Sequence, residues 1–267
     1  MTKNWVATQA LMNTAQWDDS LITFYPEAKA WMSDPILYLD RLTKDCNYLN
    51  AAELLDWNSY LRQGSTVLDV GCGGGWLTAF LSKNPRITKL IAIDSSLNYL
   101  ENFLPTVTQQ MAGDISKIET VQGVFSPILL EAESVDLIVI SSAIHHAESM
   151  GAVLAEFRRV LKPDSYLIIL NETPVGNVQF MYQMTKAFIK IFFSTAAKRY
   201  SQFSQKISAS GILYDPYLGD VDYPKWYWQK TITSSGFDIS HIQDTKLGTV
   251  VNSKGRFLHH FVCKKTA

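Results

Sequence analysis

The residues with the clearest capacity for chemistry form a glycine cluster, Gly71-Cys72-Gly73-Gly74-Gly75, directly after an apolar, β-branched stretch at 67–70. Glycine lets the backbone adopt positive φ and lets a ligand approach where a Cβ would obstruct it. A helical pattern follows at once, with Trp76, Leu77 and Phe80 at helical spacing. The N-terminus of such a helix presents free N–H groups and a partial positive charge. The cluster therefore predicts a cradle for a cofactor.

Two common phosphate-binding sites do not match this cluster. A nicotinamide dinucleotide site has glycines spaced as G-x-G-x-x-G, and here Gly71 and Gly73 fill the first two positions but Trp76 fills the third. A P-loop needs Gly-Lys-Ser or Gly-Lys-Thr after four spacer residues, and the cluster lacks that ending.

Two carboxylates accompany the cluster. Asp94 ends the next apolar stretch, Leu90-Ile91-Ala92-Ile93, and an Asp there can accept hydrogen bonds from both hydroxyls of a ribose. Asp69 lies inside the first apolar stretch, where a charged residue is unusual, so we expect it to have a partner at the site.

The glycine cluster and the acidic residues that follow it, taken in their order along the chain, resemble the motifs of a known family. Val67–Gly75, Asp94, Gly113-Asp114 and Val135–His146 together resemble the class I S-adenosylmethionine-dependent methyltransferases, over roughly residues 65–170. The resemblance is greatest to the small-molecule branch that includes the ubiquinone/menaquinone-type methyltransferases. It implies S-adenosyl-L-methionine as the cofactor and S-adenosyl-L-homocysteine as the product.

The resemblance also implies roles for individual residues. Asp94 would bind the ribose hydroxyls, Asp114 the exocyclic amino group of adenine, and Ile115 would pack on the adenine ring. The complete set of expected cofactor-binding residues is Asp69, Gly71, Cys72, Gly73, Gly75, Asp94, Ser95, Gly113, Asp114, Ile115 and Ser141.

The acceptor chemistry is expected at Ser141–Glu148, just past the fourth strand of the family core. One of His145 and His146 could act as a general base on a hydroxyl or orient the acceptor; alternatively, the pair is structural. The Asn/Asp-Pro-Pro-Tyr and Pro-Cys motifs of nucleic-acid methyltransferases are absent here. Glu148 and Glu172 are too few to indicate a metal site, so no metal is expected.

Two aromatic-rich segments flank the core and are expected to form the substrate cavity. The predicted substrate-binding residues are Trp17, Tyr25, His145, His146, Tyr214 and Trp226. Each ring could equally pack the helices onto the sheet. Between Glu172 and Asp215 the chain carries five basic residues and no acidic one. This basic segment could be a lid for an acidic acceptor, a surface for anionic lipid or a carrier domain, or a solvated helix face.

Apolar runs alternate with helical patterns from Ser65, which predicts βαβ units and a parallel sheet. The resemblance implies an α/β, Rossmann-like, seven-stranded, mostly parallel sheet whose antiparallel strand seven lies between strands five and six. Strands are expected near 66–70, 89–94, 108–112, 135–140, 165–170, from 236, and at 256–263. Helices are expected near 75–83, 96–103, 117–130, 150–161 and within 178–207.

Three parts are expected along the chain. Residues 1–63 would form an N-terminal helical cap, 64–172 and 236–267 the methyltransferase core, and 173–235 an inserted lid for substrate recognition, because this last stretch is too long for a simple connection.

Composition limits the functional classes. A net charge of −1 over 267 residues gives no field that would favour nucleic acid. Three scattered cysteines suit a reducing cytosol, and we expect a cytoplasmic protein with neither a secretion signal nor a stable membrane insertion.

The predicted function is methyl transfer to an oxygen or nitrogen, or to a carboxylate, of a small organic acceptor in secondary (natural product) or cofactor metabolism. An acidic acceptor, or one held on a carrier or peptide, would suit the basic segment. The alternatives are methylation of a quinone or lipid precursor with a membrane-touching lid, and a non-catalytic cofactor-binding module.

Overall fold

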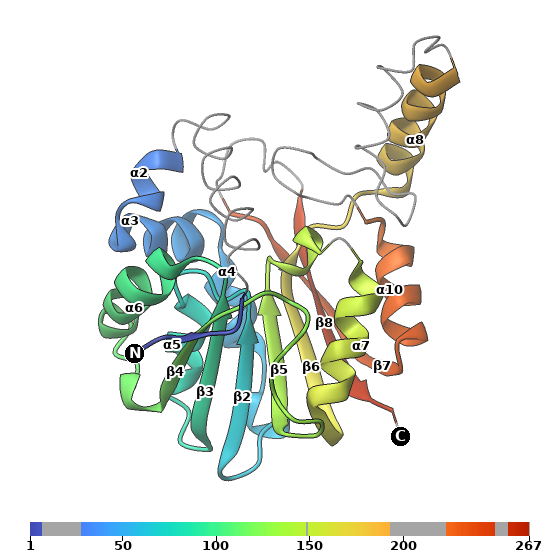
Figure 1. The fold of residues 1–267 in the computed structure, drawn as a ribbon. Coiled ribbons are helices and arrows are strands. Elements are labelled where there is room, and N and C mark those ends of the chain that lie inside the picture. Colours follow the sequence, from blue (N-terminus) through green and yellow to red (C-terminus); the bar gives the residue numbers. More distant parts are fainter. Residues whose placement is uncertain (7–27, 148, 193–222, 249–255, 267) are drawn as a thin grey trace.

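The computed structural model describes residues 1–6, 28–147, 149–192, 223–248 and 256–266. One sheet runs through this part of the chain, with the strand order β1-β4-β3-β2-β5-β6-β8-β7 (Figure 1). The strands are β1 (Lys3–Asn4), β2 (Ser65–Val70), β3 (Ile87–Asp94), β4 (Ile118–Gln122), β5 (Val135–Ser141), β6 (Leu161–Glu172), β7 (Phe237–Lys246) and β8 (Phe257–Lys265).

The sheet matches the expected Rossmann-like class, with one difference in strand number. β1 to β6 pair in parallel, and β8 is antiparallel to both β6 and β7, between which it lies. The antiparallel placement of the last strand is therefore confirmed. The described sheet has eight strands rather than seven, because Lys3 and Asn4 add a short parallel edge strand to β4.

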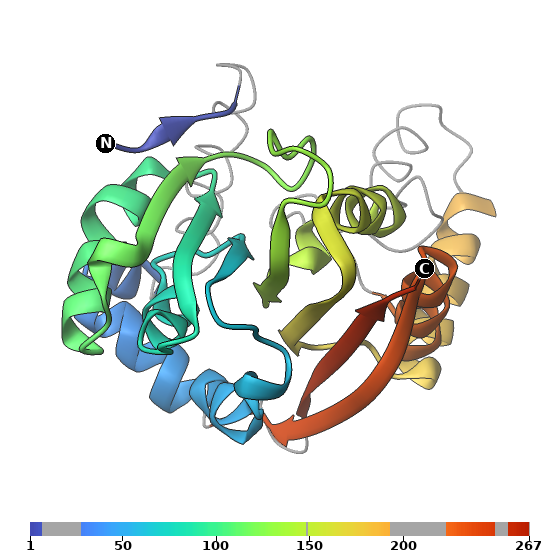
Figure 2. The same cartoon turned by 90° about the horizontal axis from the view of Figure 1, so that it is seen from below.

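Helices cover both faces of the sheet, as the view along the layers shows (Figure 2). Phe157 of one helix layer packs with Leu68 and Ile138 of the sheet, and Leu77 of the other layer packs with Val67. The helices are α2 (Ala28–Met32), α3 (Pro35–Asp40), α4 (Tyr48–Leu54), α5 (Trp76–Ser82), α6 (Leu104–Gln110), α7 (Met150–Val160), α8 (Asn177–Phe192) and α10 (Lys225–Ser234).

The predictions for residues 104–130 were wrong. A strand was expected at 108–112, but Leu104–Gln110 is helix α6, which ends where Ala112 adopts a φ of 52°. A helix was expected at 117–130, but Ile118–Gln122 is strand β4. The β-branched run of α6 imitates a strand, and its helical state is fixed by packing against α5 and α3. As a result, the loop at the carboxyl edge of the sheet is the one that follows Gln122, and not the expected loop after residue 112.

The expected helix within 178–207 is described only as far as Phe192, and the rest of it lies outside the described residues. The bounds of the cap and of the inserted segment remain a prediction.

A buried histidine links the end of β6 to β7 and β8. His260 is 1% exposed; its Nδ1 accepts a hydrogen bond from Asn171 N at 2.9 Å, so its Nε2 carries the hydrogen that Thr245 Oγ1 accepts at 2.8 Å. Burial, followed by the neighbouring His259, lowers the pKa of His260 to about 4. The folded protein therefore keeps this ring neutral.

This ring should make the protein acid-labile. Between pH 6.5 and 4 the unfolded chain binds a proton that the folded chain does not, so stability falls with acidification by up to roughly 3 kcal/mol. We predict, from chemical denaturation, that the free energy of unfolding of His260→Gln falls less between pH 6.5 and 4 than that of wild type. His241→Gln, which alters an exposed histidine of β7, should keep the wild-type slope. Identical slopes for His260→Gln and wild type would contradict the assignment.

Candidate functional site

A cavity of about 500 Å³ opens at the carboxyl edge of the parallel strands. The loops after β2, β3, β4 and β5 line it, together with side chains from the N-terminal helices. These lining residues are Trp31, Tyr38, Leu42, Tyr48, Asp69, Gly71, Cys72, Gly73, Trp76, Leu77, Ile93, Asp94, Ser95, Ser96, Tyr99, Gly123, Val124, Phe125, Ser141, Ser142, Ala143 and His146.

The glycine turn is closed in on several sides. Gly71 and Gly75 have φ values of 66° and 83°, which side chains rarely tolerate. A Cβ on Gly71 would lie 2.8 Å from the Cβ of Ala143, and one on Gly75 would lie 2.7 Å from Leu104 Cγ. Glycine is therefore required here both by conformation and by close packing.

The N–H groups of this turn are already used within the protein. Gly73 N donates to Asp94 Oδ2 at 2.8 Å, Gly74 N to Tyr38 Oη at 2.9 Å, and Gly75 N to Cys72 O at 2.9 Å. These three N–H groups of the turn are therefore not free to bind a ligand.

Asp94 connects β3 to the glycine turn. Besides Gly73 N, its carboxylate accepts a hydrogen bond from Ser96 N at 2.9 Å through Oδ1. Burial raises the pKa of Asp94, and these N–H donors oppose that rise. The carboxylate lines the cavity and has further lone pairs for hydroxyl donors.

Asp69 has the partner that its unusual position suggested. Its side chain is 1% exposed, and its Oδ2 accepts a hydrogen bond from Thr78 Oγ1 at 2.6 Å. Burial raises the pKa of Asp69 to about 7; the bond from Thr78 opposes the rise and the charge of Asp94 adds to it. The cavity therefore holds two acidic groups whose charges are poorly solvated.

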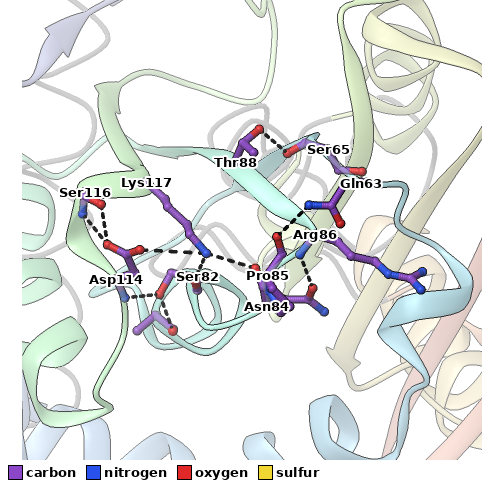
Figure 3. A network of polar contacts seen from close by, with 11 residues as sticks. Gln63, Ser65, Ser82, Asn84, Pro85, Arg86, Thr88, Asp114, Ser116 and Lys117 are labelled. Atoms are coloured by element: carbon purple, nitrogen blue, oxygen red, sulfur yellow. Dashed lines mark hydrogen bonds and ion pairs between the residues drawn. The ribbon is translucent and has the colours of Figure 1, made fainter.

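The structure does not bring Gly113, Asp114 and Ile115 into the cavity. Figure 3 shows Asp114 and Lys117 beside Ser82 and Asn84, at the end of α5 and near the amino end of β3. Asp114 accepts hydrogen bonds from Ser116 N and Oγ, and its own N–H donates to Ser82 Oγ. It therefore caps the turn that precedes β4, at the edge of the sheet opposite the cavity.

Gly123, Val124 and Phe125 occupy the place expected for Gly113–Ile115. They follow β4 directly and line the cavity, with the Phe125 ring against Gly71. The alternation of polar and apolar residues at 118–122, followed by glycine, is the signal that could have located them.

Glu172 organises the loop after β5. This carboxylate is fully buried at the end of β6, and its Oε1 accepts hydrogen bonds from Ala143 N at 3.0 Å and Ile144 N at 3.2 Å. Its Oε2 lies 2.7 Å from His145 Nδ1. A carboxylate accepts, so Nδ1 carries the hydrogen, and Nε2 is an acceptor whenever the ring is neutral. Sequence reasoning missed this pairing because the partners are 27 residues apart.

The two adjacent histidines lie together, and one lines the cavity. The ring centroids of His145 and His146 are 4.1 Å apart, and His146 is a lining residue. Ser141 also lines the cavity, and its Oγ lies 2.9 Å from Asn171 Nδ2. The predicted residues His146 and Ser141 are therefore brought to the same edge as Asp94.

Of the four aromatic residues predicted to bind the substrate, the structure describes only Trp226. Trp226 is 48% exposed, pairs edge-on with Phe180 and is not part of the cavity lining. Trp17, Tyr25 and Tyr214 lie outside the described residues. Four other residues of the N-terminal cap line the cavity instead: Trp31, Tyr38, Leu42 and Tyr48.

Two kinds of feature are not found among the described residues. They contain no group of three or more His, Cys, Asp or Glu side chains placed to hold a metal ion. Nor does any helix among them have the length and apolar character that crossing a membrane requires.

Comparison with known proteins agrees with this geometry. Residues 68–169 match the family model described as a methyltransferase domain. These residues form a class I methyltransferase domain. The match supports S-adenosylmethionine as its cofactor.

The curated relatives carry one recurrent name. This chain is 27% identical over 150 residues to the demethylmenaquinone methyltransferase of Oceanobacillus iheyensis, covering 54% of this chain and 61% of that protein. The corresponding protein of Staphylococcus aureus is 27% identical over 147 residues, covering 55% and 58%. The chain thus spans about three fifths of the length of these relatives.

Solved structures show the same fold. The YcgJ protein of Bacillus subtilis superposes with a TM-score of 0.56 at 14% identity, covering 82% of this chain and 99% of that chain. A SAM-dependent methyltransferase from Aquifex aeolicus gives 0.51 at 19% identity, covering 87% and 99%.

The buried Asp69 should destabilise the methyltransferase core at alkaline pH. Its pKa is about 7 when folded, against 3.8 ordinarily, so the folded chain binds the extra proton between these values. Stability therefore falls as pH rises through this window, by roughly 2–4 kcal/mol. We predict that Asp69→Asn is more stable than wild type at pH 8 and that the difference disappears by pH 4.

Asp238→Asn is the control, because Asp238 is exposed on β7 and should show no such pH-dependent gain. Equal denaturation midpoints for Asp69→Asn and wild type at pH 8 would contradict the assigned charge state.

Proposed function

We propose that this chain transfers a methyl group from S-adenosylmethionine to a hydroxyl oxygen of a small, uncharged organic acceptor. The observation that carries the proposal is the His145–Glu172 pair, whose histidine packs on His146. His146 lines the same cavity as the Asp94 carboxylate. The methyltransferase domain match and the demethylmenaquinone methyltransferase relatives support the reaction class.

The residues around the glycine turn fit the cofactor. Asp94 would accept hydrogen bonds from the ribose hydroxyls, and Gly71, which also lines the cavity, would lie beside the methionine part. Phe125 would pack on the adenine ring in place of the expected Ile115. Asp69 and Asp94 give the cavity a negative character that suits a cationic sulfonium. When bound, the cofactor supplies a methyl group that is already activated for transfer.

The chain's own contribution would be to position the acceptor and remove its proton. In the proposal, His145 Nε2 accepts the hydroxyl proton while Glu172 holds the opposite nitrogen and stabilises the charged ring. His146 would contact the acceptor, because it lines the cavity and packs on His145. A nitrogen acceptor remains compatible with the same geometry.

An acidic acceptor receives no support from the described lining. Among the described residues, the wall of the cavity contains no lysine or arginine, and its ionisable carboxylates would repel an anion. The hydroxyl pair formed by Tyr48 Oη and Ser142 Oγ, 2.9 Å apart, instead suits a neutral polar group. We therefore favour a neutral acceptor over a carboxylate or carrier-bound acid.

A quinone or lipid precursor is the second candidate. The curated relatives are named for a quinone substrate. On α8, the exposed apolar side chains Val178, Met181 and Tyr182 share the helix with the exposed Lys186. Such a helix can rest on an anionic membrane. Flotation with vesicles separates the candidates, since absence of binding to anionic vesicles would remove the membrane-bound one.

A cytoplasmic setting is part of the proposal. The three cysteines, Cys46, Cys72 and Cys263, are all free, as expected in a reducing compartment. A non-catalytic cofactor-binding module is the remaining alternative. Methylation of no compound in a panel of phenols, hydroquinones and amines, with cofactor binding intact, would favour it.

The first prediction of the proposal concerns cofactor affinity. Asp94→Asn should bind S-adenosylhomocysteine about 10- to 100-fold more weakly than wild type in calorimetry, because charge-assisted hydrogen bonds to the ribose are lost. Asp114→Asn is the matched control: it alters the carboxylate that the sequence favoured, at the opposite edge of the sheet, and should bind like wild type. The reverse result would show that the cofactor lies elsewhere.

The second prediction concerns the base. Glu172→Gln keeps an oxygen for Ala143 N and Ile144 N but removes the charge beside His145. We predict a kcat about 10- to 100-fold lower with unchanged cofactor affinity. The acid limb of the kcat–pH profile should move to lower pH, because a neutral amide no longer favours the protonated ring.

This measurement uses tritiated cofactor and the first acceptor methylated in the panel. His145→Ala should lose activity at least as strongly. Full turnover in both variants would remove the general-base role.

A further inference from the structure

The cofactor's carboxylate needs a donor that the glycine turn does not provide. The N–H groups of Gly73, Gly74 and Gly75 donate to Asp94, Tyr38 and Cys72 respectively. The described lining contains no lysine or arginine. Its acidic groups are Asp69 and Asp94, which when ionised attract the sulfonium and ammonium groups but repel a carboxylate.

One hydroxyl in the wall meets this need. Tyr38, on α3, lines the cavity and lies directly over the glycine turn, so that a Cβ on Gly73 or Gly74 would collide with its ring or hydroxyl. Tyr38 Oη accepts the hydrogen bond from Gly74 N at 2.9 Å, so its own hydrogen points to another partner. Among the described residues, none accepts it.

The surroundings hold this hydroxyl in place and protonated. The ring packs against Tyr99 and Phe103, with centroid distances of 5.4 and 5.6 Å, and the residue is only 6% exposed. Burial, with a smaller contribution from Tyr99, raises the pKa of Tyr38 well above its ordinary value. Tyr38 is therefore a preorganised neutral donor, and a negative charge on it is excluded at physiological pH.

We propose that Tyr38 is a cofactor-binding residue that donates its hydroxyl hydrogen to the methionine carboxylate of S-adenosylmethionine. This inference rests on the proposed function and extends it to a residue of the N-terminal cap. The Gly74 N–H bond polarises the hydroxyl and so strengthens its donation. Cofactor binding thereby ties α3 to the glycine turn through one side chain.

Two ligands separate this role from a merely structural one. S-adenosylhomocysteine carries the carboxylate, whereas 5′-methylthioadenosine carries the same nucleoside without the amino-acid part. Tyr38→Phe keeps the ring contacts with Tyr99 and Phe103 but removes the hydroxyl. Any loosening of the glycine turn should weaken both ligands equally, while loss of the donated bond should weaken only the first.

We predict by calorimetry that Tyr38→Phe binds S-adenosylhomocysteine about 10-fold more weakly than wild type while 5′-methylthioadenosine affinity changes less than about 2-fold. Tyr60→Phe is the matched control, because Tyr60 packs on Tyr166 and is not part of the cavity lining. If Tyr38→Phe melts early, the ratio of the thermal shifts given by the two ligands still reports the difference.

Equal weakening of both ligands, or of neither, would overturn the role of Tyr38 and leave the proposed function standing. If wild type itself binds neither ligand, the proposed function fails and this inference fails with it.

Discussion

The fold around the cavity depends on one constraint, the four glycines of the turn after β2. Neighbouring elements occupy the positions where Cβ atoms would lie: Tyr38 from the N-terminal cap, Leu104 from α6 and Ala143 from the loop after β5. The turn is therefore the point at which three separate parts of the chain meet. Any residue larger than glycine would have to displace one of them, and the cavity would change shape with it.

Buried carboxylates complete this arrangement. Asp94 fixes the turn after β2 to the turn after β3, and Glu172 fixes the loop after β5 to the end of β6. Asp69 bonds α5 to β2 through Thr78. Each carboxylate is stabilised by N–H or O–H donors rather than by a lysine or arginine partner. Of the three, Asp69 and Asp94 line the cavity, where a cationic cofactor would offset their charge.

The sequence could predict the elements whose signals are local. The strand ending at Asp94 and the glycine turn are visible as an apolar run and a cluster of one residue type. β4 was misplaced because the β-branched residues of α6 read as a strand, and only the packing of α6 against α5 decides otherwise. Asp114 was chosen for the cofactor through that error. The Glu172–His145 contact and the closure of Tyr38 over the turn are non-local, so no spacing in the sequence announces them.

The proposed binding site for S-adenosylmethionine is the cavity lined by Asp94, Phe125 and His146. A crystal structure of the protein grown with S-adenosylhomocysteine tests it most directly. We expect the ribose hydroxyls at hydrogen-bonding distance from Asp94, the adenine against Phe125 and the sulfur facing the His146 side of the cavity. Density for the nucleoside at the opposite edge of the sheet, near Asp114, or an empty cavity at saturating ligand, would contradict it.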